Sequence, residues 1–353
     1  MLNIAIVIKS VYSYAGTENI CNFMSDCFGA DHNVTIYSLE GGGTPFYPFE
    51  KVSEIKNLSN KKKPLISSVI DIKKRNYDIV YVISMGKLSV IFSMLALTFL
   101  DKKKTKFVAC EHVAYQSFSP AVKALKGIFL KFYDKVVVLT KADEKKYKEL
   151  NINSQFISNP IEYHGLSKNF RTKIAFSAGR FSEQKGFDML IDIWSKVVER
   201  SPEWKLMIAG DGDKFSEINN KIKALNLSES VCLLGKVTEM EKYYKNCDVY
   251  LMTSRYEGLP LVLLEAQSWG VPVIAFDCPT GPKEVISNGV NGFLVDMFNI
   301  DKYADRVCSL DDDNMFFNLS ENSTSNSKNY DSNLIKSKWL SLTSELIDTD
   351  RGK

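Results

Sequence analysis

Short apolar runs alternate with helical patterns along the whole chain, and this alternation constrains the fold more than any other feature. Most of the runs are continuously apolar, as expected for parallel strands that are buried on both faces of a sheet. Because helical segments separate the runs, the chain is predicted to be an α/β protein with doubly wound parallel sheets and right-handed crossovers. The expected strands are residues 3–8, 33–39, 78–84, 106–111, 135–140, 173–179, 204–210, 231–235, 248–254, 272–276 and 292–295.

The chain has 353 residues, which is too many for one ordinary core and fits two domains. The alternation pauses at residues 157–173, a polar stretch with a proline and a glycine that is the candidate linker. The predicted division is a Rossmann-like domain at residues 1–165, a second at 166–330, and a helix with its tail at 331–353. Residues 318–333 are polar and are expected to be a loop or a capped helix end. Ligands bind beyond the carboxyl ends of the strands in such sheets, so two facing sheets would form a cleft there.

The composition is typical of a soluble globular protein, with 45% apolar and 25% charged residues. A net charge of +3 gives no strong footprint of nucleic-acid binding. The seven cysteines are scattered without a CxxC pair or metal-ligand spacing, which indicates reduced thiols in a cytosolic protein. Residues 1–13 lack a basic n-region, so they are interpreted as a strand and not as a signal peptide. The longest apolar run, residues 88–100, is too short to span a bilayer and is predicted to be a buried helix.

Residues 254–276, SRYEGLPLVLLEAQSWGVPVIAF, place two carboxylates on a mostly apolar stretch. Pro260 suits the first turn of a helix, so Glu257 is expected in the preceding loop and Glu265 roughly two turns into the helix. Eight helical positions correspond to about 12 Å, whereas the carboxylates of a retaining hydrolase lie about 5 Å apart. The spacing suits the two ends of an elongated ligand whose anionic middle lies at the helix N-terminus. The amides there belong to Gly258, Leu259 and Leu261.

A second constellation, residues 176–194 (FSAGRFSEQKGFDMLIDIW), begins on another predicted strand. The strand ends at Gly179, and Arg180 and Lys185 lie in the short loop before the next helix. A planar guanidinium and a mobile ammonium could clamp a diphosphate and neutralise a leaving group without a metal ion. An ordinary interpretation stays open for both constellations: the cations would be solvated loop charges, and the glutamates a turn residue and a salt-bridged helix residue.

Three weaker features stand at other strand ends. Gly16, in SYAGTEN after the first strand, permits close approach of a ligand to the backbone, although an ordinary turn explains a lone glycine better. This segment is not a GxGxxG fingerprint, which argues against a dinucleotide site. His112 ends a strand and would project toward the cleft, although a histidine in this position is often structural. Residues 277–295 place a glycine-rich turn and Glu284 at a further strand-to-helix junction.

Together these motifs resemble a known family. EGLPLVLLE, residues 257–265, is similar to the E-x7-E motif of the retaining GT-B glycosyltransferases of family 4, the glycosyltransferase group 1. GRFSEQKGFDMLI, IAGDGD, GVPVIAFDCPTGPKEVISNGVNGFLV and the early AGTEN stand in the order of that family, closely over residues 174–296 and loosely over 1–165. The usual Gly-Gly before Glu284 is replaced by Thr280-Gly281-Pro282, and the first motif has one glycine instead of two. FDCPTGPKE resembles a bacterial surface-polysaccharide subset.

The resemblance implies a role for each matching residue. Glu257 would contact the transferred sugar, and Glu265 would bind the ribose hydroxyls. Arg180 and Lys185 would hold the diphosphate and stabilise it as it leaves. Gly16 would let the backbone of the first domain approach the diphosphate, His112 would lie near the sugar and acceptor, and the 235–239 loop with Lys236 would lie beside the base. The other positions expected to bind the donor are Gly179, Gly258, Leu259, Pro260, Leu261 and Gly281.

The implied GT-B architecture has an acceptor-side first domain, a second domain that binds the nucleotide sugar, and a final helix that crosses back to the first. The implied reaction moves a hexose or N-acetylhexosamine from a UDP-sugar to a saccharide acceptor, with retention by return on the same face, in bacterial O-antigen or capsule biosynthesis. No metal cofactor is expected. An NDP-sugar 2-epimerase and a non-catalytic sugar-nucleotide binding protein are the alternatives, and a plain NAD-binding protein fits worst.

Enzymes of this kind commonly extend lipid-linked saccharides, so membrane contact is a further hypothesis. A basic cluster at residues 101–106 is followed by residues 121–135, which interleave apolar residues with Lys123, Lys126, Lys131 and Lys135. A basic amphipathic helix can lie on an anionic bilayer surface, although a plain surface helix fits the pattern equally. The expected location is cytoplasmic, with peripheral contact at the inner face of the cytoplasmic membrane.

Overall fold

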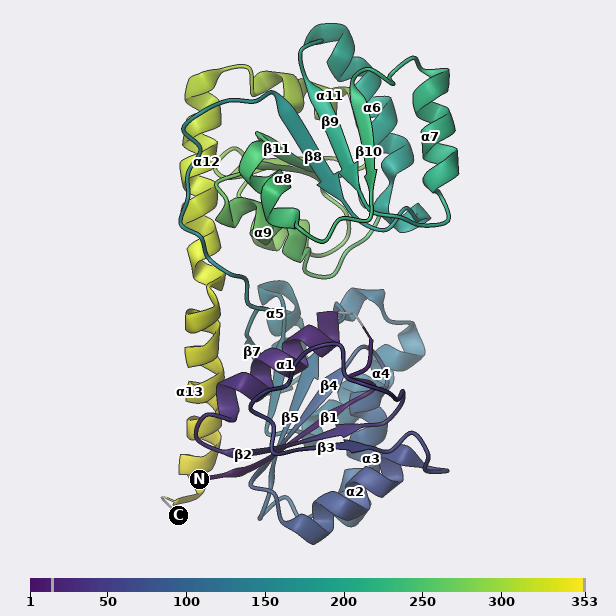
Figure 1. Ribbon diagram of the computed structural model, residues 1–353. Helices are drawn as coiled ribbons and strands as arrows, with labels where there is room; N and C mark the ends of the chain where they lie inside the picture. The colour runs from purple at the N-terminus through teal and green to yellow at the C-terminus, as the bar shows by residue number, and fades with distance from the viewer. Residues whose placement is uncertain (14–15, 352–353) are drawn as a thin grey trace. The chain divides into compact units, whose positions relative to one another are not determined.

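The computed structural model describes residues 1–13 and 16–351. The chain divides into two compact units: unit 1 is Met1–Pro160 with Asn333–Lys353, and unit 2 is Ile161–Ser332. Each unit is a parallel sheet with helices on both faces (Figure 1). The candidate linker, residues 157–173, runs as irregular backbone with a bridge between Ile161 and Asp331.

Unit 1 is built on a seven-stranded sheet in the order β3-β2-β1-β4-β5-β6-β7. The five strands predicted in this part of the chain are all present. Two short edge strands were not predicted, because EIKN in β3 and SQF in β7 are largely polar and only partly buried. The strands are β1 (Asn3–Ile8), β2 (Asn33–Ser38), β3 (Glu54–Asn57), β4 (Ile79–Ser84), β5 (Lys106–Glu111), β6 (Lys135–Val138) and β7 (Ser154–Phe156).

Alternate side chains of each strand in unit 1 point to opposite faces of the sheet and belong to two separate cores. Ile4, Ile6 and Ile8 of β1 pack with the first and last helices of the unit, α1 and α13, whereas Ala5 and Val7 pack under α2, α3 and α5. The helices are α1 (Gly16–Phe28), α2 (Pro64–Arg75), α3 (Leu88–Phe99), α4 (Pro120–Phe129), α5 (Lys141–Glu149) and α13 (Ser332–Arg351), with short 3-10 turns η1 (Tyr115–Ser117) and η2 (Leu130–Phe132).

Helix α13 completes the core of unit 1 from the far end of the chain. Trp339 is 2% exposed, and its ring meets Tyr81 of β4 edge-to-face with ring centroids 5.9 Å apart. The hydroxyl groups of Tyr81 and Thr343 share a buried hydrogen bond of 2.6 Å. The predicted return of the last helix to the first domain is therefore confirmed.

Unit 2 is built on a six-stranded sheet in the order β10-β9-β8-β11-β12-β13, and the predicted strands are all present. Its largest core lies between the sheet and α6, α7 and α11, and α12 adds Leu319 to it. Helices α8 and α9 pack on the other face, where α12 also contacts α9. The strands are β8 (Ile174–Ala178), β9 (Lys205–Ala209), β10 (Val231–Gly235), β11 (Val249–Met252), β12 (Val273–Phe276) and β13 (Gly292–Val295). The helices are α6 (Phe187–Arg200), α7 (Phe215–Ala224), α8 (Met240–Asn246), α9 (Leu261–Ser268), α10 (Pro282–Val285), α11 (Ile300–Ser309) and α12 (Asp313–Ser327), with 3-10 turns η3 (Glu183–Lys185) and η4 (Lys328–Tyr330).

The prediction of a loop or helix end at residues 318–333 is wrong, because most of this polar stretch lies in helix α12. Ser320, Ser323 and Thr324 form a buried face of the helix. Their hydroxyls donate to the backbone oxygens of Gly270 (2.6 Å), Asn291 (2.9 Å) and Leu166 (2.6 Å), respectively. Serine and threonine favour turns when they bond only nearby backbone groups, whereas here each of the three hydroxyls also binds another segment of unit 2.

Two predictions about the helices of unit 1 need correction. Residues 88–100 do form a helix, α3, but one of its faces is exposed instead of buried. The basic helix predicted at residues 121–135 ends at Phe129, and Lys126 is fully buried in an ion pair with Glu111. Lys126 is buried because it pairs with the buried carboxylate of Glu111. The spacing of the lysines in the sequence does not reveal this partner. Within residues 1–13 and 16–351, no helix is both long and apolar enough to cross a membrane.

We expect Trp339→Ala to destabilise unit 1 by about 3–5 kcal/mol, because it leaves a cavity between α13 and β4. Hydrogen exchange of peptides from β4 and β5 would measure the loss, and Ser337→Ala on the exposed side of α13 is the matched control. Unchanged protection in the Trp339 variant would show that α13 does not stabilise unit 1.

Candidate active site

The loops that follow the strands of unit 2 converge at one edge of the sheet, because the strands are parallel. Two glycines allow their backbones to touch. A Cβ at Gly210 would lie 1.8 Å from the carbonyl oxygen of Gly179, and one at Gly281 would lie 1.9 Å from that of Gly258. Both glycines also have positive φ, 135° and 88°, which other residues rarely adopt. The first contact fixes the loops after β8 and β9 against each other, and the second fixes the loops after β11 and β12.

The packed loops bring Lys185 and Glu257 together. Nζ of Lys185 lies 2.7 Å from Oε1 of Glu257, and the two side chains are 22% and 10% exposed. Gly179 makes room for the lysine, since a Cβ there would lie 3.2 Å from its Cδ and Cε atoms. The hydroxyl of Thr280 donates to the backbone oxygen of Glu257 and ties the loop after β12 to the same point. The structure thus joins the two constellations that the sequence placed on separate strands.

The other two predicted cations of unit 2 differ in their surroundings. Arg180 is exposed, and its guanidinium has no partner among the described residues. Lys236, after β10, is 84% exposed at its side chain and lies 3.8 Å from Asp211. Arg180 therefore follows β8 at the edge of the sheet that carries the Lys185–Glu257 pair, with its charge available to an anion, whereas Lys236 lies beside a carboxylate.

Helix α9 begins at Leu261 with Pro260 as its N-cap residue, one position later than predicted. Glu265 is the fifth residue of α9 and so lies about one turn into the helix, not two. Burial raises its pKa, and the hydroxyl of Tyr244, which donates to Oε2 at 3.1 Å, offsets this in part. Gly258, Leu259 and Leu261 are half-buried around the helix start. A half-buried acceptor at one end and backbone amides at the other suit a polar ligand laid along the start of α9.

Sequence reasoning missed two residues of this region, Tyr244, which bonds Glu265, and Arg255. Its guanidinium makes two hydrogen bonds to the carboxylate of Asp188, at 3.0 and 2.7 Å, and lies 3.3 Å from Glu183. Its backbone N–H donates to the oxygen of Gln184 at 2.8 Å. Burial alone would raise the pKa of Asp188, but the guanidinium outweighs it and holds the pKa below its usual value. Arg255 therefore ties the segment that carries Lys185 to the segment that carries Glu257.

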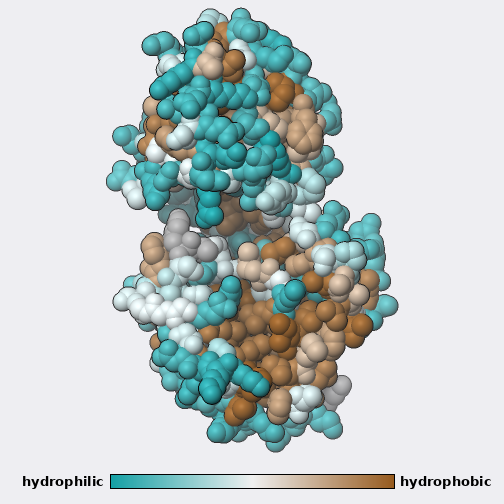
Figure 2. Space-filling view, turned by 90° about the vertical axis from the view of Figure 1, so that its right-hand side faces the viewer, coloured by the Kyte–Doolittle hydropathy of each residue, from teal (hydrophilic) through white to brown (hydrophobic). Residues whose placement is uncertain are grey.

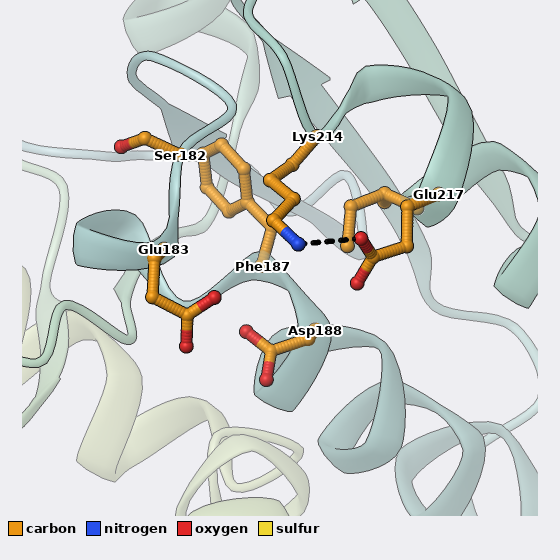
Figure 3. Close-up of a pocket in the computed structure, with 7 residues that line it drawn as sticks. Ser182, Glu183, Phe187, Asp188, Lys214 and Glu217 are labelled. Carbon is orange, nitrogen blue, oxygen red and sulfur yellow. Dashed lines mark hydrogen bonds and ion pairs between the residues drawn. The ribbon is translucent and has the colours of Figure 1, made fainter.

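A small hollow lies between residues 182–188 and the start of α7. Figure 3 shows Glu183, Asp188, Lys214 and Glu217 around it, with Lys214 donating to Glu217 at 2.7 Å. Its volume of about 10 Å³ has room for one water molecule at most. This hollow is too small for a sugar nucleotide.

In unit 1, His112 follows the last residue of β5, and its backbone N–H donates to the oxygen of Ser84. Burial lowers the pKa of His112 to about 4, so its imidazole is neutral near pH 7. The preceding residue, Glu111, is buried and accepts from Ser89 and from Lys126. These contacts hold the strand end that carries His112.

Gly16 is the first residue of α1, and a Cβ there would meet nothing within 4 Å. Glu18, two residues on, is buried and accepts hydrogen bonds from the hydroxyls of Ser13 and Thr17. A pocket of about 340 Å³ lies at the carboxyl ends of β1 and β4, lined in part by Lys9, Thr17 and Lys87. Unit 1 thus has its own space for a ligand at the carboxyl edge of its sheet.

No group of three or more His, Cys, Asp or Glu side chains that could hold a metal ion occurs among the described residues. The expectation that no metal cofactor is needed stays a prediction.

The model of the family described as glycosyl transferases group 1 matches residues 164–330. The amylovoran biosynthesis glycosyltransferase AmsD of Erwinia amylovora is 33% identical over 355 residues, covering 96% of this chain and 99% of that protein. The GalNAc-alpha-(1->4)-GalNAc-alpha-(1->3)-diNAcBac-PP-undecaprenol alpha-1,4-N-acetyl-D-galactosaminyltransferase of Campylobacter jejuni is 24% identical, covering 98% of this chain and 99% of that protein. The crystal structure of Anabaena Alr3699/HepE in complex with UDP matches with a TM-score of 0.80 at 18% identity, covering 98% of this chain and 100% of the other.

The fold and these matches define a glycosyltransferase of GT-B architecture, as the sequence predicted. The chain belongs to the family of group 1 glycosyl transferases.

We expect Arg255→Ala to free the segment around Lys185, because the carboxylate of Asp188 and the backbone oxygen of Glu183 lose the guanidinium that now binds them. Amide hydrogen exchange in residues 182–187 should speed up about tenfold, the effect of losing a buried charge-assisted contact. Arg200→Ala, which removes an exposed ion pair on α6, is the matched control. Equal exchange in the Arg255 variant and the wild type would rule out this coupling.

We expect the neutral state of His112 to make unit 1 less stable in acid. The unfolded chain binds a proton as the pH falls below about 6.5, whereas folded His112 does so only near pH 4. Its contribution therefore reduces the free energy of unfolding between about pH 6.5 and 4, by up to about 3 kcal/mol, and is constant above that window. NMR titration of the imidazole, assigned with His112→Gln, gives the pKa directly. A midpoint near 6.5 would contradict the expectation.

Proposed function

We propose that the chain is a retaining glycosyltransferase of family 4 that moves a hexose or N-acetylhexosamine from a UDP-sugar to a lipid-linked saccharide. The pathway would be bacterial surface-polysaccharide biosynthesis, such as that of O-antigen or capsule, with peripheral contact at the anionic inner face of the cytoplasmic membrane. The names of the relatives support the polysaccharide context and the lipid-linked acceptor.

The observation that carries the proposal is the Lys185–Glu257 pair at the strand ends of unit 2. On the loop that carries Lys185, the guanidinium of Arg180 has no partner in the part of the chain that the structure describes. Without ligand, Glu257 neutralises Lys185. A diphosphate would bring two further negative charges, so Lys185 and Arg180 could both turn to it. Glu257 would then be available to the hydroxyls of the sugar, and Glu265, one turn into α9, to those of the ribose.

In the proposed reaction, the bond between the anomeric carbon and the diphosphate oxygen breaks, and its electron pair leaves with UDP. Arg180 and Lys185 stabilise the negative charge that develops on the departing diphosphate. The acceptor hydroxyl forms the new bond on the face that UDP leaves, and its proton passes to a diphosphate oxygen. No carboxylate attacks the sugar, and the role of Glu257 is to bind the hydroxyls of the sugar. Neutral His112 would be a hydrogen-bonding group beside the sugar and acceptor.

The decisive experiment measures UDP release and product mass from UDP-glucose, UDP-galactose and their N-acetyl forms, each with a polyprenyl-diphosphate-linked sugar acceptor. We expect acceptor-dependent transfer from one donor. Glu257→Gln and Lys185→Met should each reduce the rate by about 100-fold or more, as expected when a group that stabilises the transition state is removed.

Glu199→Gln on the exposed surface of α6 is the matched control for the carboxylate variant. An α-linked product from an α-linked donor supports retention, and a β-linked product would refute it. Epimerised sugar released without acceptor would favour an epimerase, and failure to bind UDP would refute the donor site.

A further inference from the structure

Helix α3 has an exposed apolar face of the kind that soluble proteins usually cover. Its sequence, LSVIFSMLALTF, contains no charged residue. Ile91, Met94 and Leu97 follow one another at intervals of three, which places them on one side of the helix. They are 45%, 46% and 59% exposed, while Phe92 and Ala96 on the opposite side are buried against the sheet. A surface helix normally presents polar residues to water.

Neighbouring segments extend this face. Met85 precedes α3, Phe99 ends it, and Ile128 lies on α4, which packs beside α3. Each of these three side chains is more than 40% exposed. Figure 2 shows hydrophobic side chains gathered on one side of unit 1, the side on which Figure 1 shows α3 and α4. We call the surface formed by Met85, Ile91, Met94, Leu97, Phe99 and Ile128 the α3 face. A contiguous exposed apolar patch of this kind marks an interaction site.

Lysines surround the α3 face. Lys87 stands at the N-cap of α3, Lys103 and Lys104 follow its C-terminal end, and Lys131 follows α4. All four are exposed. None of them has a carboxylate within ion-pair distance in the part of the chain that the structure describes. The face is therefore apolar at its centre and positively charged at its rim.

This combination selects the partner. In a twofold dimer through the α3 face, the same surface of both copies would meet, so the lysine rims would repel each other. An anionic bilayer fits both features, because its head groups attract the lysines and its interface accepts the apolar side chains. We propose that the α3 face docks unit 1 onto an anionic lipid bilayer surface.

The α3 face also reaches the pocket of unit 1. Met85, Lys87 and Ile91 line the pocket of about 340 Å³ at the ends of β1 and β4. Docking would place the rim of this pocket at the lipid surface. This step rests on the proposed function, in which the acceptor is a saccharide on a lipid that stays in the bilayer. The diphosphate and first sugar would enter the pocket past Lys87, with the hydrocarbon left in the membrane.

The test is sedimentation of the full chain with vesicles of pure phosphatidylcholine and with vesicles in which about a third of the lipid is phosphatidylglycerol. We expect binding to the anionic vesicles that weakens as salt is added. Met94→Ser/Leu97→Ser should reduce binding about tenfold through lost apolar burial. Lys103→Glu/Lys104→Glu should reduce it similarly and remove much of the salt dependence.

The matched controls are Leu225→Ser/Val290→Ser and Lys223→Glu/Lys242→Glu, which change exposed side chains of unit 2. All positions are exposed, and unchanged circular dichroism would show that the variants fold. No binding to anionic vesicles, or equal losses in the controls, would overturn the proposal. So would a dimer in solution that Met94→Ser/Leu97→Ser dissociates.

Failure of this proposal can be told from failure of the proposed function. Vesicle binding needs neither donor nor acceptor. If the α3 face docks on lipid, the Met94/Leu97 variant should retain UDP binding and transfer to a water-soluble acceptor. If the wild-type chain binds anionic vesicles but does not bind UDP, the proposed donor site of unit 2 is wrong and the docking proposal stands.

Discussion

The burial of parallel strands on both faces is the constraint on which the rest of the structure depends. It leaves polar chemistry no place in the sheets except their carboxyl edges. In unit 2 that edge is closed by backbone contacts, where Gly210 meets Gly179 and Gly281 meets Gly258. The loop after β8 also packs on the end of β11, since a Cβ at Gly186 would lie 2.2 Å from the carbonyl oxygen of Thr253. Backbone packing therefore holds together the segments that carry Lys185 and Glu257.

Without a ligand, the cations at this edge are paired to different degrees. Lys185 has a carboxylate partner, Arg255 has Asp188, and Arg180 has no partner among the described residues. A polyanionic ligand could engage Lys185 and Arg180, whereas the guanidinium of Arg255 is held by two hydrogen bonds to Asp188. The cations of the site thus divide into one that maintains the loops and two that can respond to a ligand.

The strands could be predicted because continuous apolar runs leave few alternatives, and all eleven predicted runs are strands. The edge strands β3 and β7 could not, since a strand with one neighbour needs no apolar sequence. Helix α12 was missed because the partners of its serines lie more than 30 residues away. At the site, motif spacing predicted Glu257 and Lys185. Arg255 and Tyr244 escaped because their roles depend on contacts between loops that no local pattern encodes.

Both units depend on residues near the end of the chain, which bears on how the protein folds as it is synthesised. The core of unit 1 includes Trp339 and Leu342, and Tyr81 bonds a residue 262 positions later. Unit 2 needs α12 to satisfy the carbonyl groups of Leu166 and Gly270. Neither unit can therefore complete its core while the ribosome is still translating the middle of the chain. Until α13 is synthesised, one face of the first sheet lacks part of its cover, and exposed apolar surface in an incomplete core favours aggregation.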